Sequence, residues 1–226
     1  MDDAFSAIGA LADPVRRRLY DVVCGRDDGV GREEAARATG LALHTARFHL
    51  DRLVDEGLLT VERRRLTGRT GPGAGRPAKV YHRAPGEVAV SLPERGYDLV
   101  GRVFAAAVQR SLDGAPLAQT LTDEAGAAGR RDGAAYAEEH GAGGAELDRT
   151  AGALGERGFE PSPDADGGLA LRNCPFDALA REHTALVCGV NHDYVGGVLD
   201  GLGGRGVSAR LDPGAGRCCV RVVATA

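Results

Sequence analysis

The sequence contains no tryptophan and only five phenylalanine and five tyrosine residues in 226 positions. The core of such a chain must be built mainly from Leu, Val and Ala. Hydrophobic residues make up 43% and charged residues 27% of the sequence, which is typical of a globular protein. No run approaches the roughly 18 uninterrupted apolar residues of a membrane span, and the first residues lack the basic-then-apolar pattern of a secretory signal. We therefore expect a cytoplasmic protein with no membrane partner.

Signatures of catalysis are absent as well. The glycines of the C-terminal third lie in turns and between small residues, and none forms the G-x-G-x-x-G pattern of a phosphate-binding loop. Outside the cysteines, no paired carboxylates and no nucleophile with a neighbouring base have a supporting motif. We therefore expect that the protein is not an enzyme; the alternative of a thiol or iron–sulfur enzyme with an accessory DNA-binding domain has little support.

The charge is distributed unevenly along the chain. The formal net charge is −4, but residues 1–85 carry 15 basic and 12 acidic residues, whereas the remainder carries 13 basic and 20 acidic ones. Residues 62–83 contain seven basic residues and one acidic residue. A locally basic segment on a mildly acidic protein predicts contact with a polyanion at one end of the chain.

Three helices and a hairpin are predicted in the first 85 residues. The first helix begins at Asp13-Pro14, a capping residue followed by proline at the first helical position, and two further helices cover 31–40 and 41–59. The segment 59–84 has the pattern of strand, Gly/Pro/Arg-rich loop and strand, with its tip at about 68–76. In the third helix, four apolar side chains at helical spacing form the buried face: Ala46, Leu50, Leu53 and Val54. His44, Arg47, Asp51 and Arg52 are expected to lie largely outward.

These segments resemble a known family of DNA-binding domains. The stretches LADPVRRRLYDVV, REEAARATGLALHTARFHLDRLVDEGLL and GRPAKVY resemble the winged helix-turn-helix domain of ArsR-type bacterial transcription regulators over about residues 5–84. The resemblance implies a homodimer that places each third helix in the major groove of a double-stranded DNA operator. The sequence departs from the usual pattern at Ala42, where a capping Ser or Thr is common, and at Phe48, where a polar residue is common.

The DNA-contacting residues follow from this resemblance. His44, Thr45 and Arg47 are expected to reach base edges, with Arg47 as a candidate for a bidentate contact with guanine. Phosphate contacts position the domain without reading sequence. The other basic side chains predicted to contact DNA are Arg52, Arg63, Arg64, Arg65, Arg69, Arg76 and Lys79.

The rest of the chain predicts a connector and a second domain. A helix is predicted from Pro93, with an apolar stripe that either pairs with its twin in a dimer or packs on its own domain; the stripe consists of Tyr97, Val100, Phe104, Ala107, Val108 and Leu112. Residues 115–142 are rich in Ala and Gly and are interpreted as a helical connector. We predict an α+β protein with a winged helix-turn-helix domain at 1–86, a helical connector and dimerisation region at 87–142, and a small α+β sensor domain at 143–226.

Five cysteines, an odd number without a C-x-x-C pair, favour metal ligands, reactive thiols or core residues over a disulfide framework. Four of them, Cys174, Cys188, Cys218 and Cys219, lie in the last 60 or so residues, and His183 lies between the first two. Thiolates bind zinc or iron–sulfur clusters. Because neighbours on a strand point to opposite faces, only one of the Cys218–Cys219 pair is expected to face the other thiols. The alternative is that the cysteines pack as small hydrophobic residues.

The cysteines that follow the ArsR-like domain occur as the stretch NCP, a further cysteine and a late cysteine. This arrangement is similar to that of iron–sulfur-responsive repressors of the SufR kind. This similarity implies a repressor in which Cys174, Cys188 and one of Cys218 and Cys219 hold a cluster of the 4Fe-4S type, with His183 or another group completing the ligands. The alternatives are the same regulator with a zinc site or a thiol redox switch, and a regulator that senses a small molecule without metal.

Overall fold

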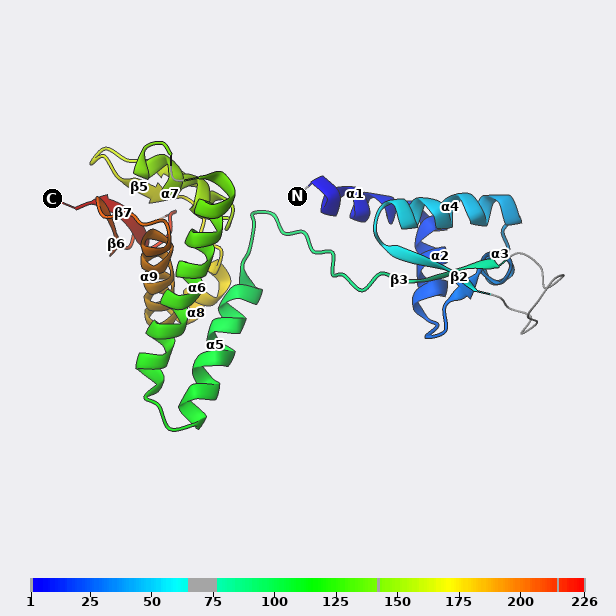
Figure 1. The fold of residues 1–226 in the computed structure, drawn as a ribbon, viewed down its shortest axis with the longest axis horizontal. Coiled ribbons are helices and arrows are strands. Elements are labelled where there is room, and N and C mark those ends of the chain that lie inside the picture. Colours follow the sequence, from blue (N-terminus) through cyan, green and yellow to red (C-terminus); the bar gives the residue numbers. More distant parts are fainter. Residues whose placement is uncertain (1, 65–76, 142, 215, 226) are drawn as a thin grey trace. The chain divides into compact units, whose positions relative to one another are not determined.

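The computed structural model describes residues 2–64, 77–141, 143–214 and 216–225 (Figure 1). The chain divides into two compact units, Met1–Val90 and Ser91–Ala226. Each unit has its own hydrophobic core. Among the described residues, no helix combines the length and the apolar character needed to cross a membrane.

The first unit is a small helical domain with a three-stranded sheet. The sheet order is β1-β3-β2, with both neighbouring pairs antiparallel. The three predicted helices and both strands of the predicted hairpin are confirmed, whereas the predicted hairpin tip at 68–76 lies outside the described residues. The elements are α1 (Asp2–Ala10), α2 (Pro14–Cys24), β1 (Val30–Gly31), α3 (Arg32–Thr39), α4 (Leu43–Asp55), β2 (Leu59–Arg64) and β3 (Ala78–Arg83).

Local capping explains where these helices begin and end. The Asp13 carboxylate accepts hydrogen bonds from the backbone N–H groups of Val15, at 2.7 Å, and Arg16, at 3.2 Å, and Pro14 occupies the first helical position of α2. Gly40 ends α3 in the left-handed conformation, with φ of +69°, which glycine adopts without strain. The fully buried side chains of this core include Leu19, Val23, Ala35, Ala46, Leu50, Leu53 and Tyr81.

The second unit combines five helices with a four-stranded antiparallel sheet of order β4-β5-β7-β6 among its described residues. From residue 143 onward the elements follow the predicted order α-β-β-α-α-β-β. The elements of the unit are α5 (Tyr97–Leu112), α6 (Leu117–His140), α7 (Glu146–Gly155), β4 (Pro161–Pro163), β5 (Leu169–Leu171), α8 (Asp177–Glu182), α9 (Thr184–Gly201), β6 (Val207–Leu211) and β7 (Val220–Ala224).

Helix α5 begins at Tyr97, so the prediction of a start at Pro93 is wrong. The residues before Tyr97 bind to a distant loop instead of coiling. Arg95 donates hydrogen bonds to Asn173 Oδ1 at 2.8 Å and to the Cys174 carbonyl oxygen at 2.7 Å. The buried Asn173 in turn donates to the carbonyl oxygen of Glu94 at 3.0 Å. The Gly96 N–H donates to the Pro175 carbonyl oxygen at 3.1 Å, so this bond and the one to Glu94 engage backbone groups that a helix starting at Pro93 would have used.

The Ala/Gly-rich segment expected as a connector forms α6, which packs along α9 inside the second unit (Figure 1). Glycines at the crossing bring the two backbones into close contact. A Cβ atom on Gly129 would lie 2.0 Å from the Tyr194 carbonyl oxygen, and one on Gly133 would lie 2.2 Å from the Val198 carbonyl oxygen. From the other side, a Cβ on Gly197 would lie 2.2 Å from a carbonyl oxygen of α6. The glycines therefore serve close helix packing, and α6 belongs to the core of the second unit.

We predict that Gly129→Ala destabilises the protein by about 1–3 kcal/mol, because the added methyl group forces α6 and α9 apart. Gly196→Ala is the matched control: it lies on α9, nothing approaches its Cβ position within 4 Å, and alanine stabilises a helix by about 0.5–1 kcal/mol over glycine. Urea unfolding followed by circular dichroism measures both effects. Equal stabilities for the two variants would contradict the close crossing.

Candidate functional site

Helix α4 follows the turn after α3, and one of its faces is exposed to solvent. Its inner face, formed by Ala46, Leu50 and Leu53, is buried against α2 and α3. Ala42 precedes the helix in an extended conformation and makes no side-chain cap, as the sequence indicated. The packing of α4 therefore depends on its apolar face and on interactions with the hairpin rather than on a cap.

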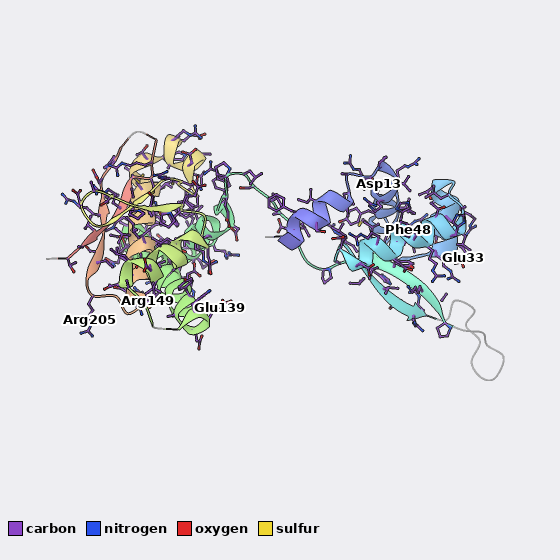
Figure 2. The ribbon with its side chains drawn as sticks, turned by 90° about the horizontal axis from the view of Figure 1, so that it is seen from above. Asp13, Glu33, Phe48, Glu139, Arg149 and Arg205 are labelled. Atoms are coloured by element: carbon purple, nitrogen blue, oxygen red, sulfur yellow. The ribbon has the colours of Figure 1, made fainter. Side chains whose placement is uncertain are left out.

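The outward face of α4 carries most of the residues predicted to read DNA. His44 and Arg47 are exposed, and Thr45 is half-buried. Phe48 lies between them and the second half of the helix, with 65% of its surface exposed (Figure 2). Arg52 is exposed one turn later and forms an ion pair with Glu56. The face combines cationic, hydrogen-bonding and apolar groups.

The carboxylate of Asp51 connects α4 to strand β3. Lys79 Nζ donates to Asp51 Oδ1 at 2.6 Å, and the hydroxyl of the buried Tyr81 donates to the same oxygen at 2.9 Å. Arg47 Nε lies 3.6 Å from Asp51 Oδ2. Although burial raises it, the hydrogen bonds from Lys79 and Tyr81 hold the pKa of Asp51 below its usual value, so the group is charged at neutral pH. Helical periodicity predicts that Asp51 points outward and gives no sign of its contact with β3.

The basic residues of the hairpin differ in how exposed they are and in whether they have partners. Arg63 and Arg64 are exposed on β2, and Arg64 donates to the Asp28 carbonyl oxygen at 2.8 Å. Lys79 is paired with Asp51 inside the unit, so a phosphate contact would compete with that ion pair. The predicted contacts Arg65, Arg69 and Arg76 lie outside the described residues.

Comparison with known proteins supports this arrangement. Residues 11–62 match the family described as a helix-turn-helix domain. The matched residues include α2, α3 and α4. The match supports the resemblance to ArsR-type regulators and indicates a DNA-binding transcription regulator. No curated protein and no solved structure matches the chain.

Pairwise side-chain interactions link four cysteines of the second unit. Cys174 follows β5, Cys188 lies on α9, and Cys218 and Cys219 precede β7. The side chain of Cys174 interacts with that of Cys218, and the side chain of Cys188 interacts with that of Cys219. Both members of the adjacent pair therefore face another thiol, contrary to the expectation that only one would. Strand alternation does not apply, because β7 begins at Val220 and Cys219 lies in the bend before it.

Cys188 and Cys218 are buried, whereas Cys174 and Cys219 are half-buried. Hydrogen bonding to Cys218 and burial raise the pKa of the Cys174 thiol well above its usual value. Burial likewise raises the pKa of Cys188. The interaction with Cys174 lowers the pKa of Cys218, but the interaction with Cys219 and burial outweigh it and raise that pKa to about 11. Since the thiolate is the nucleophile, Cys174, Cys188 and Cys218 are poorly reactive as arranged.

Asn191 is the polar neighbour of this thiol cluster, by which we mean Cys174, Cys188, Cys218 and Cys219. Its Nδ2 donates to Cys218 Sγ at 3.0 Å. Its Oδ1 is buried and has no hydrogen-bond partner among the described residues. The sequence offered no signal for Asn191 beyond its place one turn after Cys188 on the same helix.

Two further residues are candidates as ligands or as a free thiol, His183 and Cys24. His183, predicted as a further ligand, is exposed at the junction of α8 and α9. Cys24 belongs to the first unit, where it interacts with Tyr20. Within the described ranges, no group of three or more Cys, His, Asp or Glu side chains is placed so that it could hold a metal ion. Metal binding at the thiol cluster would therefore require loss of the thiol protons and movement of the sulfur atoms.

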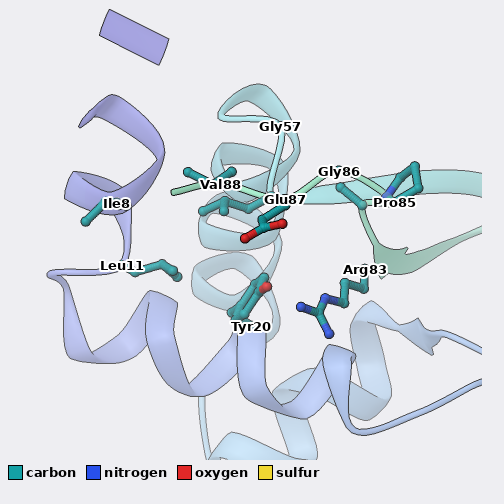
Figure 3. A pocket seen from close by; sticks show the side chains of 11 residues that line it. Ile8, Leu11, Tyr20, Gly57, Arg83, Pro85, Gly86, Glu87 and Val88 are labelled. Atoms are coloured by element: carbon teal, nitrogen blue, oxygen red, sulfur yellow. The ribbon is translucent and has the colours of Figure 1, made fainter. Parts of the chain in front are cut away.

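A cavity of about 670 Å³ lies in the first unit beside α1 and α2, bordered by the segment 84–88 (Figure 3). The side chains of Tyr20, Arg83 and Glu87 supply its polar groups. Burial and the interaction with Cys24 raise the pKa of Tyr20, so its hydroxyl stays protonated. The volume is within the range of small-molecule sites. The apolar part of the lining comes from Ile8, Leu11, Leu58 and Val88.

Proposed function

We propose that the protein is a transcriptional repressor that binds its operator as a homodimer and is controlled by an iron–sulfur cluster at the thiol cluster. The observation that carries the DNA-binding part is the outward face of α4 within the helix-turn-helix domain. In such domains the first turns of the second helix reach base edges in the major groove. His44 and Arg47 occupy those turns and are exposed.

The two kinds of DNA contact come from different elements. The guanidinium of Arg47 has the geometry for a bidentate contact with guanine. Its ion pair with Asp51 is long and exposed, and such pairs contribute little, so a base competes with it at small cost. Arg63 and Arg64 on β2 are in place for phosphate contacts, which are independent of sequence.

We predict that Arg47→Ala weakens operator binding by about 1–3 kcal/mol and relaxes the preference for the correct sequence. Lys79→Ala is expected to weaken binding to all sequences alike and to reduce the salt dependence. Arg205→Ala removes the same charge from an exposed position in the second unit and serves as the control. Fluorescence anisotropy on operator and scrambled duplexes measures the affinities. A uniform loss for both Arg47→Ala and Lys79→Ala would contradict the division between base and phosphate contacts.

The homodimer is proposed from the surface of α5. The predicted apolar stripe divides in the structure: Val100 and Ala107 are buried, whereas Tyr97, Val108 and Leu112 are 41%, 47% and 76% exposed. These three side chains follow one another along the same side of the helix at spacings of eleven and four residues, close to whole turns. A second copy of the same helix would cover this apolar strip, as a two-fold interface does.

We predict that Leu112→Glu converts a dimer into monomers, because a carboxylate at the interface would be buried without a partner. Leu186→Glu introduces the same charge at an exposed leucine of α9 and is expected to leave the dimer intact. Size-exclusion chromatography with light scattering gives the mass of each variant. A monomeric wild-type protein, or a dimeric Leu112→Glu variant, would contradict the proposed interface.

The thiol cluster supports the sensing part of the proposal through its donor chemistry. Four cysteines are the usual ligand set of a 4Fe-4S cluster, and pairwise side-chain interactions link four cysteines from three segments here. The Asn191 N–H directed at Cys218 Sγ would stabilise a ligating thiolate. A bound cluster would supply a group sensitive to oxygen and iron supply. Because four thiols can complete the ligand set, the exposed His183 is not needed.

Control of the operator requires that the cluster favour one arrangement of the protein over another. In the structure the side chains of Cys174 and Cys218 interact, and the backbone N–H of Cys218 donates to the Leu171 carbonyl oxygen at 2.8 Å. Cluster binding would remove the thiol protons and reorganise the segments before α8 and β7. The cluster-bound and cluster-free proteins would differ at these two junctions.

We predict that the full chain, purified without oxygen, contains iron and inorganic sulfide. Cys174→Ser and Cys188→Ser are expected to lose both, whereas Cys24→Ser retains them because Cys24 lies in the first unit. Metal and sulfide analysis, together with operator binding before and after exposure to air, measures the effect. A colourless protein with stoichiometric zinc would support a zinc site instead. Unchanged responses to oxygen and iron in both serine variants would refute sensing by these cysteines.

A further inference from the structure

Phe48 is the large apolar side chain in the middle of the DNA-reading face of α4. It is 65% exposed, more than any other phenylalanine among the exposed large hydrophobic residues of the described chain. Its ring lies 5.2 Å from that of His49 in an edge-on arrangement. Nothing in the packing of the first unit requires an aromatic residue there, since the core of α4 is formed by Ala46, Leu50 and Leu53 on the opposite side.

The surroundings of Phe48 favour nucleic acid as the occupant of this surface. His44 and Arg52 lie one turn before and one turn after Phe48, on the same side of the helix. Arg47 is its immediate neighbour, and all three line the same depression with it. The nearby Asp51 carboxylate is engaged by Lys79 and Tyr81. The same depression is lined by Arg32 and Asp55, so three arginines and two carboxylates surround the apolar centre. The apolar centre complements the apolar groups at the floor of the major groove, and the arginines complement its acceptor groups and the phosphates at its edges.

We propose that Phe48 contacts the 5-methyl group of a thymine in the operator and so recognises that base, an inference that rests on the proposed operator binding. The major groove exposes one apolar group on its base edges, the thymine methyl, and phenylalanine is among the side chains that contact it. A phenyl ring cannot accept or donate the hydrogen bonds by which the other bases are distinguished. The operator half-site therefore contains a T·A pair opposite Phe48, beside the position read by Arg47.

The experiment removes only this methyl group. An operator is first selected from random duplexes by the full-length protein, and each thymine of one half-site is then replaced by deoxyuridine. We expect one replacement to weaken wild-type binding about fourfold, the effect of withdrawing one methyl group from an apolar contact. The Phe48→Ala variant is expected to bind duplexes with thymine and with deoxyuridine at this position equally well, whereas Phe48→Leu retains part of the preference for thymine.

Phe5→Ala is the matched control, because Phe5 is an exposed phenylalanine on α1 of the same unit. It is expected to keep the wild-type ratio of thymine to deoxyuridine affinity. Thermal unfolding and light scattering show whether Phe48→Ala keeps its fold and oligomeric state, which its exposure predicts. A variant that changes oligomeric state while keeping the wild-type ratio would assign Phe48 to a protein contact and overturn the inference.

The outcomes separate this inference from the proposed function. If the protein selects no sequence over bulk DNA, operator binding itself fails, and thymine reading fails with it. If an operator is selected but no deoxyuridine replacement weakens binding, the regulator stands and the role of Phe48 is refuted. A methyl preference that persists in Phe48→Ala also refutes it, because another side chain then reads the thymine.

Discussion

A single carboxylate connects α4, the helix proposed to read DNA, to the sheet of its domain. Lys79 and Tyr81 are two positions apart on β3, so their side chains leave the same face of the strand and both reach Asp51. The Tyr81 ring is fully buried, and its hydroxyl requires a partner, which the charged Asp51 supplies. This connection sets the rotation of α4 about its axis. It leaves Arg47 and Phe48 exposed and turns the apolar residues inward.

The ion pairs with Asp51 also reduce the positive charge of the domain that is free to contact DNA. Four basic side chains already have partners within the protein: Arg47, Arg52, Arg64 and Lys79. Fewer positive charges are therefore free to contact DNA than the number of basic residues suggests. Exposed ion pairs are weak, and phosphate oxygens or base edges can replace them. The pair of Lys79 with Asp51 differs because Asp51 also binds Tyr81. The Tyr81 hydrogen bond holds Asp51 in place when Lys79 is removed, so losing Lys79 mainly removes positive charge beside the hairpin.

Local signals predicted much of the fold, and long-range contacts account for the errors. The Asp13-Pro14 start of α2 and the Gly40 end of α3 depend on neighbouring residues, and both were predicted from sequence. The start of α5 was wrong because Arg95 binds residues that lie some 80 positions away. Asp51 was assigned outward by helical periodicity, which carries no information about the strand that later meets it. The Ala/Gly composition of α6 indicated small side chains but not the helix that they would contact.

The thiol cluster shows why sequence alone left its role open. Four neutral thiols suit a buried site, because protonated cysteine packs as a small hydrophobic residue. Four thiolates do not suit it, because burial penalises each charge, as the raised pKa values of Cys174, Cys188 and Cys218 reflect. A bound cation or cluster would offset that penalty and make the charged form stable in the same place. The core and ligand interpretations therefore differ in protonation and in the position of a few sulfur atoms rather than in fold, and the supply of metal would select between them.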